Sequence, residues 1–312
     1  MSVVVVGAGI AGVACARVLA AAGVDVVVHE RSRAVGGRMA SPRVHDRRVD
    51  TGAAYFTVEP GSDFAAVAAS WADRGLAHEW TTTMGVHTPD GTTTKDGPAR
   101  WSAPGGLRSL VADLAGGLDV RLGSTVTGVG PGRTVDGTGH EAVVLAMPDP
   151  QALRLLDPAH GAARAQLDGR HWKPVIAVAV GAQHRSWGEL TATFVNDHPV
   201  LALVADDGAR RGDGAPVLLA HTTNDLAAQH LDDPGAVVPA VLDALADVLP
   251  GELDVAWTHV HRWTFAQPAG SREQTHWFAD GLGLCGDGWG RSKVETAWTS
   301  GTALGRAVAG SL

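Results

Sequence analysis

Cysteine, lysine and long apolar runs are all scarce in this chain of 312 residues. The two cysteines, Cys15 and Cys285, are too few for a disulfide framework, and no CxxC pair offers the spacing of a zinc site. The net charge is −8 and no basic patch is visible, which argues against nucleic acid or an anionic membrane as a partner. Since no run of about 18 apolar residues occurs, we expect no membrane span. The few cysteines favour a reducing compartment, so we expect a soluble, cytoplasmic protein without a bound metal.

Glycine is abundant instead, and three glycines near the N-terminus form a motif. The β-branched run Val3 to Val6 leads directly into G-A-G-I-A-G, residues 7–12. Residues 10–22 favour a helix that stops at Gly23, and residues 24–30 favour a second strand. This order predicts a βαβ unit.

Each motif glycine has a role in binding a dinucleotide. Gly7 makes the tight turn, Gly9 lets the backbone approach a pyrophosphate, and Gly12 lets the helix pack closely against the strand. Glu30 can accept both hydrogen bonds from an adenosine ribose, which disfavours a 2′-phosphate there. The alternative is a glycine-rich turn that binds nothing. The predicted contacts at this end are Gly7, Gly9, Ile10, Ala11, Gly12 and Glu30.

Two further segments favour FAD over NAD. Residues 30–38 read E-R-x-x-x-x-G-G-R, and residues 50–56 read D-x-G-A-x-Y-F. Both runs resemble the flavin-containing amine oxidase superfamily, in which the glycine pair and arginine follow the pyrophosphate and the second run passes beside the flavin ring. The resemblance implies FAD contacts from Arg31, Gly37, Arg38, Met39, Gly52, Ala53, Tyr55 and Phe56.

The C-terminal region supplies a second glycine-rich turn. A short strand, residues 283–285, leads into G-D-G-W-G, and the S-x-x-E run that starts at Ser292 predicts a capping box opening a helix. Gly286, Asp287 and the helix start near Val294 are predicted to contact FAD, with the helix dipole suited to the flavin edge that becomes negative on reduction. Cys285 is not placed for a covalent bond, so the FAD should be noncovalent.

Small residues recur along the last predicted helix. Ala297, Gly301, Gly305 and Ala309 are four residues apart and therefore share one face. This face permits close approach to a neighbouring helix, to a sheet or to the cofactor.

The two halves of the FAD site lie far apart in the sequence, so we expect a discontinuous domain. The predicted fold is α/β, with a Rossmann-type FAD-binding domain (1–60, 98–150 and 266–312) and a substrate-binding domain of antiparallel β-sheet plus helices (61–97 and 151–265). Residues 120–129 alternate as a strand does. The resemblance implies that Val126 contacts adenine.

Within the superfamily the chain resembles the renalase-like bacterial members along nearly its whole length. The similar runs are L-L-A-H-T-T (218–223), H-R-W-T-F-A-Q-P (261–268) and G-D-G (286–288). The resemblance implies a dihydronicotinamide isomer of NAD(P)H as substrate and O₂ as acceptor, giving H₂O₂. His221 and Asp207, the latter on a loop, would orient the substrate. Ala54 and Asp207 depart from the family pattern, which puts the fine substrate preference in doubt.

Two other functions remain open. The first is oxidation of a small amine, although no lysine matches the one that the larger amine oxidases place near the flavin. The second is a flavoprotein without turnover. His259 and His261 share a strand face, but no third ligand follows at metal spacing.

Overall fold

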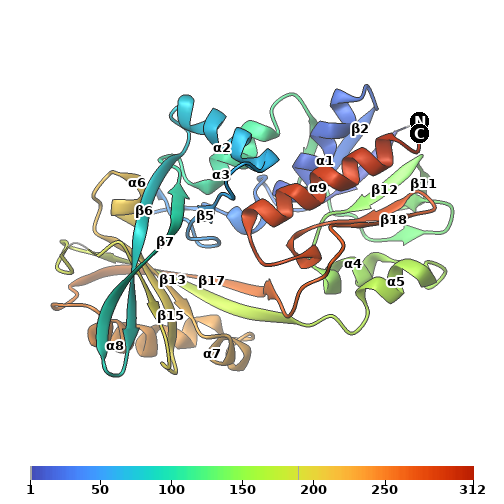
Figure 1. Ribbon diagram of the computed structural model, residues 1–312. Coiled ribbons are helices and arrows are strands. Elements are labelled where there is room, and N and C mark those ends of the chain that lie inside the picture. The colour runs from blue at the N-terminus through green and yellow to red at the C-terminus, as the bar shows by residue number, and fades with distance from the viewer. Residues whose placement is uncertain (1, 189) are drawn as a thin grey trace. The chain divides into compact units, whose positions relative to one another are not determined.

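The computed structural model describes residues 2–188 and 190–312, and the chain divides into two compact units (Figure 1). Unit 1 comprises Met1–Met39, Arg108–Trp172 and Gln267–Leu312, and unit 2 comprises Ala40–Leu107 and Lys173–Ala266. These bounds place residues 40–60 and 98–107 in unit 2 and residues 151–172 in unit 1, unlike the bounds expected from the sequence. The assignment of FAD binding and substrate binding to separate domains stays a prediction.

A six-stranded sheet forms the centre of unit 1. Its strands are, in order, β18 (Trp277–Ala279), β19 (Leu282–Leu284), β12 (Ala142–Leu145), β1 (Val3–Val6), β2 (Val26–Glu30) and β8 (Asp119–Leu122). All neighbours pair in parallel except β18 with β19. The four valines of β1 are buried, as expected for the central strand of a parallel sheet covered on both faces.

The predicted βαβ unit is confirmed. Strand β1 leads into α1 (Ile10–Ala21), and β2 pairs with β1 from Val26 onward. A Cβ on Gly12 would lie 1.9 Å from the Gly7 carbonyl oxygen, so only glycine lets the helix begin this close to the turn. Gly23, with φ of +77°, reverses the chain after the helix.

Helix α9 (Val294–Ala309) packs directly against α1, and Figure 1 shows the two side by side. A Cβ on Gly301 would lie 1.9 Å from the Ala11 carbonyl oxygen, and one on Gly305 would lie 2.8 Å from the Cys15 carbonyl oxygen. The small-residue face therefore serves close helix packing.

The remaining elements of unit 1 are short. They are η1 (Gly37–Met39), α4 (Asp149–Leu155), α5 (Gly161–Leu167), η3 (Asp287–Trp289), the small sheet of β9 (Val129–Gly130), β10 (Thr134–Val135) and β11 (Thr138–Gly139), and α3 (Leu107–Leu114), which begins on the last residue of unit 2. The continuous strand expected over residues 120–129 is wrong. Strand β8 ends at Leu122 because Gly123 takes a φ of +66° and turns the chain.

Unit 2 is built on an eight-stranded sheet. Its order is β17 (Val255–Pro268), β13 (Trp172–Ala182), β16 (Val217–Thr222), β15 (Leu201–Asp206), β14 (Ala192–Val195), β6 (His78–Thr88), β7 (Gly91–Ser102) and β5 (Phe56–Thr57). The described pairings are antiparallel except β14 with β6. The other elements are the β3 (Arg43–Val44) and β4 (Arg47–Arg48) hairpin, α2 (Asp63–Asp73), α6 (Asp207–Arg211), α7 (Asn224–Gln229), η2 (Pro234–Val237) and α8 (Val238–Val248). An antiparallel sheet with helices was the predicted form of the second domain.

The two faces of this sheet differ in their side chains. One face packs against α8 through an aliphatic core that includes Val178, Leu218 and Leu245. The other face carries small side chains such as Ala177 and Ala179, with partly buried aromatic rings over them. Burial of the first face stabilises the sheet, and the second face carries the partly buried aromatic side chains.

Along the described residues of the chain, no helix combines the length and the apolar character that a membrane crossing requires.

Candidate functional site

Glu30 ends β2 beside the glycine turn and is already held by its own chain. Its Oε2 accepts the Ala8 backbone N–H at 2.8 Å, and its Oε1 accepts the Ser32 backbone N–H at 2.8 Å. The Ser32 hydroxyl also lies 2.7 Å from Oε1. A carboxylate offers about four acceptor positions, so three protein donors leave room for about one more.

A change of partner by the Ser32 hydroxyl can free a second acceptor position on the Glu30 carboxylate. It lies 2.7 Å from the Ala34 carbonyl oxygen as well as 2.7 Å from Glu30 Oε1, and one hydroxyl proton can serve only one of them. When Ser32 donates to Ala34, Glu30 regains the capacity for two ribose hydroxyl groups. The sequence did not predict this role of Ser32.

Asp287 and Arg38, both predicted FAD contacts, are bonded to each other. Arg38 Nη1 donates to Asp287 Oδ2 at 2.7 Å, and Nη2 donates to Oδ1. Ser292 Oγ donates to the same Oδ2 at 3.0 Å. Arg38 also lies over the Trp172 ring, 5.0 Å from its centre.

The predicted capping box at Ser292 is wrong. The residue before α9 is Lys293, which makes no side-chain cap, and the Ser292 hydroxyl turns to Asp287 instead. A carboxylate near the hydroxyl attracts its proton more strongly than a neutral acceptor does, and donating to Asp287 takes the hydroxyl away from the helix start.

In unit 2, side chains from two distant elements hold the predicted flavin-facing segment 50–56. Trp263 Nε1 on β17 donates to the Thr51 carbonyl oxygen at 2.7 Å, and Arg210 Nη1 on α6 donates to the Ala54 carbonyl oxygen. Asp50 Oδ1 accepts the Leu107 backbone N–H at 3.0 Å and thereby ties the segment to the start of α3.

His221, at the end of β16, holds the same segment through the Gly52 backbone. Burial and the nearby charge of Arg210 lower the pKa of His221 to about 4, against the raising effect of the bond to Gly52. Its Nε2 is buried and has no hydrogen-bond partner among the described residues. His221 is therefore a neutral imidazole near pH 7, with a ring nitrogen left over as an acceptor.

Several backbone N–H groups of segment 50–56 have no acceptor among the described residues. Over the described part of the chain, no acceptor is found for the N–H groups of Gly52, Ala53 and Ala54, although Gly52 and Ala54 are buried. Buried N–H groups without partners are rare in proteins. They are available as donors to a ligand with acceptor atoms, as an isoalloxazine ring has.

Asp207 is placed differently from the expectation. It is the first residue of α6 rather than part of a loop, and its side chain has no exposed surface. Its Oδ1 accepts from Arg210, and its Oδ2 accepts from Arg47 at 2.7 Å and Arg211 at 3.1 Å. Arg211 Nη2 also lies 3.3 Å from Asp50 Oδ2.

Electrostatics keep this cluster charged. Burial alone would raise the pKa of Asp207, but the charges of Arg210, Arg211 and Arg47 outweigh it and hold the pKa below its usual range. Both oxygens of Asp207 are thus committed to arginines. We therefore interpret it as a support for α6 and segment 50–56, and not as a group that touches substrate.

Sequence reasoning missed the aromatic face of the unit 2 sheet. Its partly buried rings are Tyr55, Trp80, Phe194, Trp257 and Trp263. The His45 ring stacks on Trp257 with 4.8 Å between centres, and the Trp257 indole covers Gly181, where a Cβ would lie 2.1 Å from the ring. The signal in the sequence was the alternation of rings at 257, 259, 261, 263 and 265, which places all five on one face of β17.

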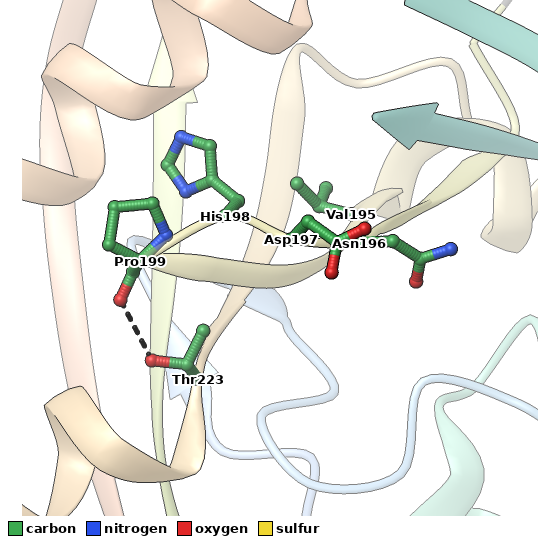
Figure 2. A pocket seen from close by; sticks show the side chains of 6 residues that line it. All are labelled: Val195, Asn196, Asp197, His198, Pro199 and Thr223. Atoms are coloured by element: carbon green, nitrogen blue, oxygen red, sulfur yellow. Dashed lines mark hydrogen bonds between the residues drawn. The ribbon is translucent and has the colours of Figure 1, made fainter. Parts of the chain in front are cut away.

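A hollow elsewhere on unit 2 contains none of the predicted residues. It is lined by residues 195–199 and Thr223 (Figure 2). The Thr223 hydroxyl donates to the Pro199 carbonyl oxygen at 3.0 Å. His198 Nδ1 accepts the backbone N–H groups of Val200 and Leu201, so its ring supports the loop.

Comparison with protein families agrees with this geometry. Residues 5–71 match the model of an NAD(P)-binding Rossmann-like domain, and residues 58–308 match that of flavin containing amine oxidoreductases. The chain belongs to the flavin containing amine oxidoreductase family. It is an FAD-dependent oxidoreductase.

Several solved structures share the fold. A putative protoporphyrinogen oxidase from Exiguobacterium sp. 255-15 is 14% identical with a TM-score of 0.77, and the match covers 100% of this chain and 99% of that one. Cyclohexylamine oxidase from Brevibacterium oxydans IH-35A is 15% identical with a TM-score of 0.78 over 99% of both chains. A putrescine oxidase variant is 16% identical with a TM-score of 0.80 over 100% of this chain and 99% of that one. At these identities the likeness shows the fold alone.

The residues present fit FAD. In unit 1 the turn retains its three glycines, and Glu30 retains acceptor capacity for a ribose. In unit 2, taken by itself, segment 50–56 offers N–H donors for which no acceptor is found among the described residues. When bound, FAD supplies the two-electron chemistry of the family, and the chain supplies binding and orientation.

Proposed function

We propose that the protein is a renalase-like oxidase that takes a hydride from a dihydronicotinamide, an isomer of NAD(P)H, and passes the electrons to O₂ to give H₂O₂. FAD is noncovalent, and its contacts are the residues named from the sequence, including Gly7, Glu30 and Asp287. The protein acts on a small molecule.

The observation that carries the substrate class is the state of His221. A dihydronicotinamide loses a hydride and becomes aromatic, so no base has to remove a proton. An alkyl amine is protonated near pH 7 and must first lose that proton. With a pKa of about 4, His221 is a poor base, whereas its Nε2 can accept a hydrogen bond from a carboxamide N–H.

The ring-lined face of unit 2 gives further support. Indole and imidazole rings such as those of Trp257 and His45 can stack on flat heteroaromatic groups. In this structure the two rings stack on each other. A nicotinamide ring is such a group.

Oxidation of a small amine is the second candidate, because aromatic rings such as Trp263 and Tyr55 also attract amine substrates. A flavoprotein without turnover is the third.

Anaerobic mixing of the FAD-loaded protein with separate donors distinguishes the three. The donors are the dihydronicotinamide isomers reduced at the 2- and 6-positions, ordinary NADH, and a panel of amines. We expect rapid bleaching of the flavin absorbance by the isomers, followed by one H₂O₂ per flavin when O₂ is admitted. Bleaching by amines alone would establish the second candidate, and no bleaching by any donor would establish the third.

Acid precipitation tests the noncovalent attachment. Flavin colour is expected in the supernatant. Colour that stays with the pellet would contradict the proposal.

A further inference from the structure

A buried network of unit 1 contacts the glycine-rich turn 286–290 through two residues, Arg272 and Asp149, that the sequence did not predict. Its centre is Arg272, in the connection between β17 and β18. The Arg272 side chain is 6% exposed and that of its partner Asp149 is 5% exposed, with Nη2 at 2.8 Å from Oδ1.

The same guanidinium reaches two carbonyl groups. Nη1 donates to the Gly288 carbonyl oxygen at 2.8 Å, and Nη2 donates to the Gln166 carbonyl oxygen at 2.7 Å. The Arg272 Cζ atom lies 4.1 Å from the centre of the Trp289 ring, a distance typical of a cation–π contact. One side chain therefore holds two consecutive residues of the turn, by hydrogen bond and by ring contact.

Asp149 extends the network toward the other end of the turn. Its Oδ2 accepts from Trp172 Nε1 at 2.8 Å, and the Trp172 ring carries Arg38, which bonds both oxygens of Asp287. The chain of contacts thus starts and finishes on the turn. It leaves little space, because a Cβ on Gly288 would lie 3.1 Å from Asp149 Oδ2.

We infer that Arg272 and Asp149 form a brace that sets the path of residues 286–290 and so places Asp287 for FAD binding. Arg272 is a positioning residue, since it acts through the backbone of Gly288 and the ring of Trp289. A guanidinium suits this task because its planar fork can hold a carboxylate and two carbonyl groups together, which a lysine ammonium on a flexible stem cannot do in one geometry.

The inference does not depend on which substrate the protein oxidises. The first measurement that tests it is the dissociation constant of the complex between FAD and the apoprotein. It is obtained from the quenching of flavin fluorescence, at a temperature where circular dichroism shows that each variant is folded. The second measurement is the visible circular dichroism of the bound flavin, which reports how the ring is held.

We expect Arg272→Met to raise the FAD dissociation constant at least tenfold and to change the visible circular dichroism. Arg272→Lys keeps the charge facing Asp149 but loses the fork, so it should raise the constant about threefold to tenfold. Gly288→Ala crowds the brace without removing a charge and should also raise the FAD dissociation constant. The matched control is Arg170→Met, an exposed arginine of the same unit, with no expected change.

The outcomes separate positioning from mere stability. If Arg272→Met does not fold, Arg272→Lys and Gly288→Ala decide, since both keep the ion pair. Variants that are less stable yet bind FAD within twofold of the unmodified protein, with the same visible circular dichroism, would overturn the inference.

Discussion

Each unit contains a buried charged cluster, and the two clusters are built in different ways. In unit 2, Asp207 meets Arg210 and Arg211 within one turn of α6, at separations of three and four residues. In unit 1, Arg272 and Asp149 are 123 residues apart in the sequence. The first cluster therefore combines ion pairs within one helical turn with the distant Arg47, 160 residues before Asp207, whereas the second is made by distant segments alone.

The largest expected effect tests the unit 2 cluster. Asp207→Asn leaves Arg47, Arg210 and Arg211 with too little negative charge in a buried place, so the free energy of unfolding should fall by about 3–5 kcal/mol. Chemical denaturation measures it. The control is Asp213→Asn, whose side chain is 49% exposed and also pairs with Arg47. That change should cost less than about 1 kcal/mol, and equal losses in the two variants would remove the distinction.

Glu30→Ala should chiefly affect FAD binding in unit 1. The loss of charge-assisted hydrogen bonds of about 1.5–3 kcal/mol each should weaken FAD affinity by roughly one to several factors of ten. Ser32→Ala should have a smaller effect, because it removes one donor to Glu30 and keeps the carboxylate. Fluorescence titration of the apoprotein measures both, and an unchanged affinity in Glu30→Ala would show that this residue does not contact the ribose.

His221 gives unit 2 a pH dependence of stability. Its pKa falls from 6.5 to about 4 on folding, so the unfolded chain binds the extra proton first as the pH falls. Stability is therefore complete above pH 6.5 and is lost between that pH and about 4. In the unmodified protein, His221 should lower the free energy of unfolding by about 2–3 kcal/mol between pH 7.5 and about 4.5. His221→Asn, which retains an N–H donor, should abolish this contribution. Denaturation curves at the two pH values decide, and identical pH dependence in both proteins would contradict the burial of a neutral His221.

The smallest expected effect concerns the helix pair of unit 1. Gly301→Ala should destabilise the protein by about 1–3 kcal/mol, since the added methyl group would meet the Ala11 carbonyl oxygen. Gly161→Ala is the control within α5, where nothing lies within 4 Å of the new Cβ. It should be neutral or slightly stabilising. A thermal melt in which both variants match the unmodified protein would show that α9 does not need glycine there.

The sequence was informative where structure depends on neighbouring residues. The valine run, the glycine motif and Gly23 predicted β1, α1 and β2 because each acts on its own turn or strand. The small-residue face of α9 was visible for the same reason. Ser292 misled because a capping box is a local pattern, and Asp287, which competes for the hydroxyl, belongs to the preceding turn of the chain.

Contacts between distant segments escaped prediction. Nothing near Arg272 indicates that it would meet Asp149, and nothing near Trp263 indicates a bond to Thr51. Asp207 was placed on a loop because the short α6 has little periodicity to reveal it. The position of His221 at a strand end was predictable, but its lowered pKa depends on burial and on Arg210, which only the folded chain provides.

The most direct test of the account is the pH dependence of flavin reduction by a dihydronicotinamide isomer, measured by anaerobic rapid mixing with the unmodified protein and with His221→Ala. The proposal that His221 orients the donor and takes no proton predicts a rate that is nearly flat from about pH 5.5 to 9. It should fall tenfold to a hundredfold in the variant, the scale of one or two lost hydrogen bonds, while reoxidation by O₂ stays unchanged. A steep pH dependence that vanishes in His221→Ala would instead make His221 an acid or base and contradict the proposed hydride donor.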